Sequence, residues 1–282
     1  MGVFTFLARR YVAGKTIAEA IAVARKLNAT GIFATLDILG EAVTSSEETE
    51  GAVQQYLLLL EEIKNSGAKA DISMKLSMLG LDIDEQLCRR HVREILERAR
   101  ILDSFVWFDM ESSKYTEKTV QIYIQSLHEF KHLGIAIQAY LFRSTGDVET
   151  LSKLPSHVRL VKGAYKEAKD IAFERKEDVD LNYRTLMKML LRGSGFTAIA
   201  THDLSIIEDA KQIIKEESIP KDAFEFQMLY GIRREYWKKL VDEGYALRIY
   251  VPFGPKWLPY MLRRLRERKE NTYFVLKHLF SR

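Results

Sequence analysis

The sequence predicts an eight-stranded (βα)8 barrel that forms one domain over residues 1–282. Three observations predict this fold class: the chain length, the composition, and an alternation of two kinds of segment. A chain of 282 residues with 47% hydrophobic and 29% charged side chains suits one globular domain of barrel size. Apolar runs of strand length recur eight times, and helix-period segments separate them. Buried parallel strands have this continuous apolar pattern, and connecting helices complete the βα units.

The elements are expected in a regular order along the chain. A helical lead-in covers residues 14–28, where apolar side chains recur at helical spacing. The strand-like runs cover 31–39, 70–78, 105–111, 135–141, 157–165, 196–202, 224–229 and 246–254. The helical segments cover 52–63, 85–101, 117–133, 182–191, 205–214 and 235–241, with a short, weak one at 146–154. The charged segment 166–180 interrupts the alternation, and we expect a lid or a disordered surface loop there.

The last apolar run leads into a distinctive segment at residues 246–267. Its first half alternates like a strand and ends at Pro252 and Gly254, and Pro255 then suits the first turn of a C-terminal helix. At about 100° per residue, one face of this helix carries polar and charged side chains. They are Tyr260, Arg263, Arg264 and Glu267. Such a face can be a solvated surface, but its place directly after a strand end favours a role at the barrel mouth.

The formal net charge of +4 is distributed unevenly. Residues 256–282 hold eight Lys and Arg but two Asp and Glu, so the C-terminus is basic as well as amphipathic. This tail could contact an anionic membrane surface, or it could be an ordinary packed helix with a solvated outer face. Nucleic acid is not expected as a partner, because aromatic residues do not interleave with the basic ones.

Cysteine usage and hydropathy indicate a cytoplasmic protein. Cys88 is the single cysteine, which excludes an internal disulfide and fits a reducing compartment. No apolar run approaches the ~20 residues of a membrane span, and the N-terminus lacks the pattern of a secretory signal. A peripheral location on the inner membrane stays open through the basic C-terminus.

Polar side chains stand near the carboxyl end of every strand-like run. In (βα)8 barrels the chemistry is carried out at these ends. Each polar residue alone could be a satisfied core group, but their presence on all eight runs favours a functional site. The residues are Asp37, Glu41, Lys75, Ser77, Asp109, Glu111, Gln138, Tyr140, Arg159, Lys162, Tyr165, Thr201, His202, Asp203, Gln227 and Tyr250.

Other motifs carry less weight. The HEFKH sequence at residues 128–132 matches the H-E-x-x-H zinc-protease pattern. Its histidines lie away from the apolar stripe of the expected helix and no third ligand is evident, so no metal is expected. No G-x-G-x-x-G sequence or P-loop follows a strand. A Schiff-base aldolase is an alternative function, with Lys75 or Lys162 as the nucleophile in an apolar strand.

Several strand-end segments together resemble the proline dehydrogenase family. The most specific are VRLVKGAY at 158–165, FEFQMLYG at 224–231 and RRLRE at 263–267, with weaker support from LDILGE, MKLSMLG, FDMES, IQAYL, ATHD and RIYVPFG. The likeness extends from about Arg10 to the C-terminal helix, and the length suits the monofunctional bacterial form. The family often has Asn where Asp203 stands. The resemblance implies a distorted (βα)8 barrel.

The resemblance also implies a reaction, the FAD-dependent oxidation of L-proline to 1-pyrroline-5-carboxylate. FAD would accept a hydride from the carbon beside the ring nitrogen, and the electrons would pass to a quinone. Nine matching positions are implied to hold the cofactor: Gln138, Arg159, Val161, Lys162, Gly163, Tyr165, Thr201, His202 and Gln227. Seven are implied to bind the substrate: Lys75, Leu229, Tyr250, Tyr260, Arg263, Arg264 and Glu267. Asp109 matches a carboxylate at the flavin and is grouped with Lys75, Tyr250, Arg263 and Arg264 as catalytic.

These implied roles agree with the chemistry of the side chains. Arg263 and Arg264 offer the bidentate, permanently charged groups that a free carboxylate prefers. The resemblance suggests that Glu41 and Arg263 form an ion pair that closes over the substrate as a gate. Tyr250 is expected at the end of the last strand, where its ring would lie against the proline ring and exclude a 4-hydroxyl group.

Overall fold

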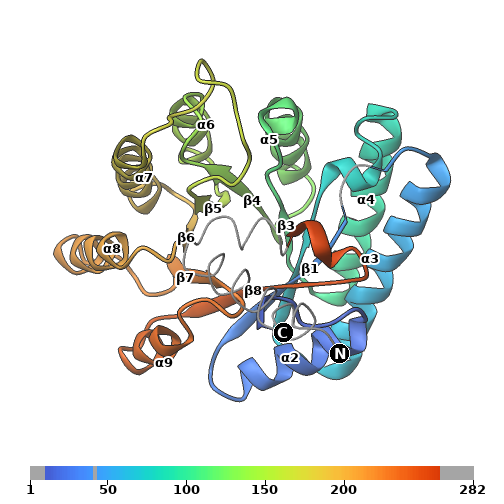
Figure 1. Ribbon diagram of the computed structural model, residues 1–282, viewed down its shortest axis with the longest axis horizontal. Helices are drawn as coiled ribbons and strands as arrows, with labels where there is room; N and C mark the ends of the chain where they lie inside the picture. The colour runs from blue at the N-terminus through green and yellow to red at the C-terminus, as the bar shows by residue number, and fades with distance from the viewer. Residues whose placement is uncertain (1–9, 41–42, 261–282) are drawn as a thin grey trace, which may run out of the picture.

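The chain folds as a closed parallel barrel inside a ring of helices (Figure 1). The structure is a computed structural model and describes residues 10–40 and 43–260. Each strand pairs with its neighbours in sequence, and β8 closes the barrel by pairing with β1, from Phe33 opposite Arg248 to Ile38 opposite Phe253. The predicted (βα)8 barrel is therefore confirmed. The strands are β1 (Phe33–Ile38), β2 (Ala70–Met74), β3 (Val106–Phe108), β4 (Leu133–Gln138), β5 (His157–Val161), β6 (Phe196–Ala200), β7 (Phe224–Leu229) and β8 (Leu247–Phe253).

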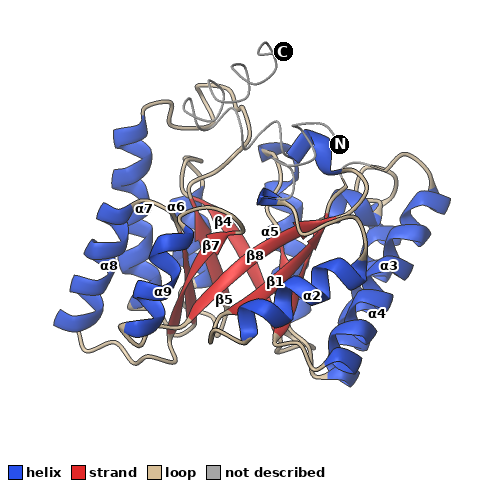
Figure 2. Cartoon of the chain, turned by 60° about the horizontal axis from the view of Figure 1, so that its bottom comes forward, coloured by secondary structure: helices blue, strands red, loops and turns tan. Residues whose placement is uncertain are grey.

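Helices follow the strands in turn and surround the barrel, as Figure 2 shows from the side. They are α2 (Ile17–Asn28), α3 (Ser46–Ser66), α4 (Glu85–Leu102), α5 (Ser113–Leu127), α6 (Ser144–Leu151), α7 (Lys176–Leu191), α8 (Leu204–Glu216) and α9 (Arg234–Asp242), with a short 3-10 helix η1 (Leu76–Leu79) after β2. A capping box at Thr16 and Glu19 begins the lead-in helix α2. Ser45 accepts a backbone hydrogen bond at the start of α3, which begins six residues before the apolar pattern indicated.

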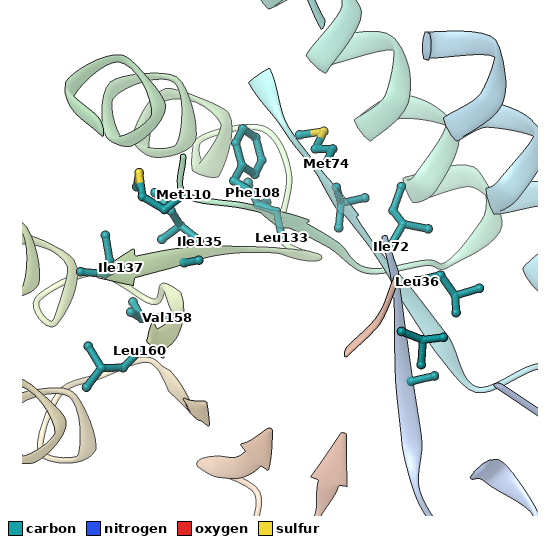
Figure 3. Packing of buried hydrophobic residues seen from close by; sticks show 14 of the residues in the cluster. Leu36, Ile72, Met74, Phe108, Met110, Leu133, Ile135, Ile137, Val158 and Leu160 are labelled. Atoms are coloured by element: carbon teal, nitrogen blue, oxygen red, sulfur yellow. The ribbon is translucent and has the colours of Figure 1, made fainter. Parts of the chain in front are cut away.

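Side chains alternate between two environments along the strands. Apolar residues such as Leu36, Ile72 and Phe108 point from the sheet toward the helices and form the core (Figure 3). The residues between them point into the barrel, and many of these are polar or charged, including Thr35 and Arg159, which meet across it. The apolar core between sheet and helices thus supports the fold, while the barrel interior is left for polar groups.

Several predicted boundaries differ from the structure. Strand β2 ends at Met74, because the chain turns at Lys75 into η1 instead of continuing to residue 78. Helix α5 ends at Leu127, so the HEFKH segment, which was predicted to be helical, lies outside the helix. The tertiary reason is that Leu133 and Gly134 pair with β3 as the start of β4. Gly134 suits this position because a Cβ there would lie 2.5 Å from the indole ring of Trp107.

The segment 166–180 is partly ordered by its neighbours. Helix α7 begins within it at Lys176, and an isolated antiparallel bridge joins Ala172 to Leu141. The Phe173 backbone N–H donates to the Tyr140 carbonyl at 2.8 Å. The described residues thus hold this segment against the loop after β4, and the expectation of a disordered loop is wrong.

Two further findings concern membrane-spanning helices and the predicted site residues that the structure does not describe. Among residues 10–40 and 43–260, no helix is long and apolar enough to cross a membrane. Four predicted site residues lie outside the described residues, and so does the basic tail beyond Tyr260. They are Glu41, Arg263, Arg264 and Glu267.

Candidate active site

A cavity of about 790 Å³ opens at the carboxyl ends of the strands. All the described residues that the resemblance implies to be catalytic, substrate-binding or cofactor-binding contribute to its lining, although they come from seven different strands or the loops after them. They are Lys75, Asp109, Gln138, Arg159, Val161, Lys162, Gly163, Tyr165, Thr201, His202, Gln227, Leu229, Tyr250 and Tyr260. Three other strand-end candidates, Ser77, Glu111 and Tyr140, do not line the cavity. The structure thus brings the described residues that the resemblance implies together in one cavity, and the role of each stays a prediction.

Lys75 is held by two carboxylates on the barrel wall. Its ammonium group forms an ion pair with Asp37 and lies 3.7 Å from Oδ2 of Asp109. Burial alone would lower the pKa of this lysine, but Asp37 and Asp109 together raise it above the ordinary value. Lys75 therefore remains a cation. A Schiff-base nucleophile must be a neutral amine, so these contacts count against the aldolase alternative at this position.

Asp109 is the centre of a buried hydrogen-bond network. Its Oδ1 accepts from Ser73 at 2.7 Å and from the Arg159 guanidinium at 2.9 Å, while its Oδ2 accepts from the Tyr250 hydroxyl at 2.6 Å. Burial, followed by the nearby Asp109 charge, raises the pKa of Tyr250 well above its usual value. Tyr250 therefore stays protonated and keeps donating to Asp109.

The sequence predicted that Tyr250 ends its strand, and the structure shows that it does not. Strand β8 continues for three residues to Phe253, because its pairing with β1 extends to Ile38. The ring of Tyr250 thus lies inside the barrel, where the Arg159 guanidinium is 5.4 Å from its centre, and it also contributes to the cavity wall.

Arg159 connects the cavity to a second layer of charges deeper in the barrel. Its Nε donates to Oε1 of Gln227 at 2.7 Å, and its guanidinium lies over the Trp107 ring at 4.3 Å. The Gln227 amide in turn donates to Glu225 at 2.6 Å, and Glu225 also pairs with Arg248 at 2.7 Å. Because Glu225 takes the amide N–H, the Gln227 carbonyl must face Arg159.

The sequence reading missed this second layer. Arg248 also pairs with Asp71 at 2.9 Å, and Asp71 accepts from the Trp107 indole N–H at 3.0 Å. The signal was present in the period-two spacing of polar residues within apolar strands. It appears as Asp71, Ser73 and Lys75 in one run and as Glu225 and Gln227 in another.

The loops after β2, β3 and β4 are fixed to one another by buried polar contacts. The Glu111 carboxylate accepts from the Ser77 backbone N–H at 3.0 Å and from the Ser77 hydroxyl. The Gln138 side-chain amide donates to the Glu111 carbonyl at 2.9 Å. Glu111 thus anchors η1, which begins directly after Lys75, and helps to hold that lysine in place.

The loops after β5 and β6 form a charged rim. Lys162 pairs with Asp180 and, at 3.0 Å, with Asp203, and Lys176 contacts the same two carboxylates. Burial would raise the pKa of Asp203, but hydrogen bonds from Lys162 and Ser205 lower it below its usual range. The rim therefore carries two cations that a polar ligand could reach by displacing their carboxylate partners.

The ends of β6 and β7 are joined through His202. The Leu229 backbone N–H donates to His202 Nε2 at 2.9 Å, so the ring proton of the neutral imidazole is on Nδ1. At the end of β5, Gly163 has a φ of +119°, and a Cβ there would lie 2.2 Å from the Tyr140 ring. Only glycine fits this turn without displacing the Tyr140 ring.

Two other outcomes concern residues around the site. Tyr260 is buried against Tyr11, Val12, Leu39 and Ile232, so the start of the expected C-terminal helix faces the barrel mouth. Among the described residues, no cluster of three His, Cys, Asp or Glu side chains could hold a metal ion. Arg233, which the sequence reading did not select, also lines the cavity.

Comparisons with known proteins place these features in a family. The family profile described as "Proline dehydrogenase" matches residues 20–277. "Proline dehydrogenase 1" from Bacillus subtilis (strain 168) is 43% identical over 275 residues, which cover 98% of this chain and 91% of that protein. "Proline dehydrogenase" from Deinococcus radiodurans is 40% identical over 280 residues, covering 98% and 90%.

A solved structure supports the same relationship in three dimensions. The crystal structure of proline utilization A (PutA) from Bdellovibrio bacteriovorus inactivated by N-propargylglycine superposes with a TM-score of 0.88 at 28% identity. The match covers 95% of this chain and 33% of that one, so this chain spans about a third of that protein.

Proposed function

This chain belongs to the proline dehydrogenase family and catalyses the oxidation of L-proline to 1-pyrroline-5-carboxylate, and we propose that it does so with FAD bound in the strand-end cavity. The observation that carries the proposal is the convergence on that cavity of all the described residues that the resemblance implies to bind substrate or cofactor. The family is flavin-dependent, and FAD is the form implied by the resemblance. The whole of residues 1–282 is proposed to act as one catalytic domain.

The lining residues suit a dinucleotide flavin. Ala136, Val161 and Met228 supply an apolar wall for a planar ring, and the rim cations Lys162 and Lys176 suit a pyrophosphate. Gln138, Arg159, Val161, Lys162, Gly163, Tyr165, Thr201, His202 and Gln227 are the residues proposed to hold it. When bound, FAD would accept the hydride that leaves the carbon beside the proline nitrogen.

The charged residues of the cavity provide a preorganised environment for this chemistry. Arg159 is 3% exposed and fixed by Asp109 and Gln227, so its charge can stabilise the negative charge that builds up on reduction without reorganising. Lys75 remains cationic and can attract the substrate carboxylate. Tyr250 and Leu229 would wall the proline ring and exclude water from the reacting carbon.

The remaining substrate contacts are proposed to come from the C-terminal helix. Arg263 and Arg264 would bind the carboxylate in bidentate fashion, Tyr260 and Glu267 would complete the site, and Glu41 would pair with Arg263 as a gate. Replacing Arg264 by Met should raise KM for proline about tenfold or more, since a charge-assisted contact contributes about 1.5–3 kcal/mol. Steady-state kinetics measure the effect, and an unchanged KM would place the carboxylate elsewhere.

A quinone is proposed as the electron acceptor, and the basic C-terminus is proposed to make the peripheral membrane contact that would bring the two together. The support is the excess of basic residues in 256–282.

The visible spectrum of the purified protein tests the proposal. The protein should be yellow, and proline should bleach the flavin band in the absence of oxygen. A protein that stays colourless after refolding with excess FAD would contradict flavin chemistry and favour the aldolase alternative. N-propargylglycine inactivated the PutA relative, and incubation with it should irreversibly prevent the bleaching of the flavin band by proline. N-propylglycine, which lacks the alkyne, is the matched control and should not prevent this bleaching irreversibly.

A further inference from the structure

Arg233 occupies an unusual position between β7 and α9. It is the residue that precedes α9, and its backbone is in the left-handed region with φ 50° and ψ 43°. Only two other non-glycine residues among those described, Asp103 and Ser218, share a positive φ. Such backbone strain is retained mainly where the surrounding structure or a function requires it. Here it accompanies an arginine that lines the cavity.

Arg233 is half-buried, and among the described residues its Nε lacks a hydrogen-bond partner. This Nε atom is itself buried, and no carboxylate of the described residues pairs with it. Arg159 and Arg248, by contrast, are each paired with a carboxylate and further acceptors. A buried N–H without an acceptor destabilises the chain by its full desolvation penalty. An arginine in a cavity with an unfilled donor therefore points to a ligand.

The surroundings of Arg233 favour an anion. Lys256 also lines the cavity and adds a second positive charge, while Leu229 and Pro259 contribute apolar surface to the same lining. Apolar walls lower the local dielectric constant and strengthen charge-assisted hydrogen bonds to an anionic oxygen. The planar guanidinium suits a carboxylate or a phosphate, both of which accept two parallel N–H bonds.

We propose that Arg233 binds an anionic oxygen group of a small molecule in this cavity, in addition to the contacts proposed above for Lys75, Arg263 and Arg264. This inference rests on the proposed function, which supplies two sources of such a group. One is the carboxylate of the amino-acid substrate, and the other is a phosphate of the dinucleotide cofactor. Arg233 combines a left-handed backbone with a side chain that lines the cavity.

The test uses two variants of the full chain and one matched control. Arg233→Gln removes the charge and most of the donors, while Arg233→Lys keeps the charge without the guanidinium. Arg234→Gln is the control, because it makes the same charge change one residue further on, where the side chain is exposed and lies over the Tyr230 ring at 4.8 Å. Thermal unfolding of each variant verifies folding. If Arg233→Gln fails to fold, Arg233→Lys alone carries the test.

Two pairs of ligands distinguish the sources. Tetrahydrofuran-2-carboxylate is compared with the neutral tetrahydrofurfuryl alcohol by perturbation of the flavin spectrum, and FAD is compared with riboflavin by fluorescence titration. For a substrate carboxylate, the Kd of the acid should rise about tenfold or more in Arg233→Gln, while that of the alcohol stays within twofold. For a cofactor phosphate, the Kd of FAD should rise similarly while that of riboflavin does not. Arg233→Lys should show a smaller rise of the same kind.

Three outcomes would overturn the inference. They are unchanged affinities for both charged ligands, equal losses for the charged and neutral members of each pair, and the same losses in Arg234→Gln. These outcomes concern Arg233 only. As long as the parent protein binds FAD and proline bleaches its flavin band, the proposed function stands. A parent protein that binds neither FAD nor the acid would overturn both.

Discussion

At the scale of single residues, Lys75 shows why the barrel can hold charges in its interior. It is 6% exposed, and Asp37 and Asp109 lie at its ammonium group, so its charge is compensated without water. A buried ion pair adds little net stability over an apolar pair of the same size, but removing one partner leaves an uncompensated charge. The same lysine is proposed to attract the substrate, so its replacement should affect folding as well as binding.

Lys75→Met should lower the free energy of unfolding by about 3–5 kcal/mol, because Asp37 would remain buried without its counter-charge. Chemical denaturation measures this change. The double variant Lys75→Met, Asp37→Asn should recover a large part of the lost stability while KM for proline stays raised. If the single variant were as stable as the parent, Lys75 would not be compensating the two carboxylates.

Tyr250 is proposed to control substrate choice, and its hydroxyl group fixes the ring through Asp109. Tyr250→Phe should leave the preference for proline over trans-4-hydroxyproline within a few fold. The parent should prefer proline by about ten- to a hundred-fold in kcat/KM, because the Tyr250 ring leaves a 4-hydroxyl group without a hydrogen-bond partner. Tyr250→Ser removes this ring and should make the preference smaller. The ratio of kcat/KM values on the two substrates decides it. A ratio unchanged by Tyr250→Ser would show that the ring does not determine specificity.

At the scale of elements, the loops after the strands carry the site, and their conformations depend on a few small residues. The turn after β5 needs Gly163, since φ is +119° and the Tyr140 ring occupies the space of a Cβ. This turn also presents Lys162 and Tyr165 to the cavity. A change of backbone here should therefore disturb cofactor binding more than it disturbs the barrel.

Gly163→Ala should weaken FAD binding by about tenfold or more and should lower the melting temperature, because the backbone and the Tyr140 ring must both move. Gly51→Ala is the matched control. It lies in α3, has no atom within 4 Å of an added Cβ, and should stabilise the protein by about 0.5–1 kcal/mol. FAD titration and thermal unfolding measure the two effects. Equal FAD affinity in Gly163→Ala and the parent would contradict a role for this turn in the cavity.

At the scale of the whole molecule, several phenol groups are buried around the barrel. Burial raises the pKa of Tyr56, Tyr123, Tyr183 and Tyr250 above the usual value of 10.0. In the unfolded chain these groups ionise near their usual pKa. The stability that comes from this difference is thus present in full below pH 10 and is lost as the pH rises toward the folded-state values.

Stability should therefore fall steeply above about pH 10, with a contribution of about 1.4 kcal/mol per pH unit from each of these tyrosines. Denaturant unfolding between pH 8 and 11 measures the slope. Tyr183→Phe should have a shallower slope above pH 10, since it removes one such group, whose hydroxyl donates to the Leu160 carbonyl at 2.9 Å. Identical slopes for the variant and the parent would rule out this explanation.

The amino-acid sequence by itself determined the barrel and the edge at which the site lies. Buried parallel strands require continuous apolar runs, and that local pattern was sufficient to find every strand from β1 to β8. Polar residues at the ends of those runs were equally visible, since a functional barrel keeps its chemistry there. Boundaries were less accurate, as at β2 and α5, because partner strands and not local spacing decided where each element ended.

Only the tertiary structure decided which polar groups meet. Arg159 reaches Thr35, Asp109 and Gln227 across the barrel, and Glu225 determines how Gln227 faces it. These contacts depend on the tilt and register of eight strands, which no local pattern contains. The unfilled donor of Arg233 was likewise invisible, because spacing in sequence says nothing of which acceptors surround a side chain. The reason is physical: a hydrogen bond requires donor and acceptor atoms within about 3 Å, and only closure of the barrel brings atoms from distant strands that close.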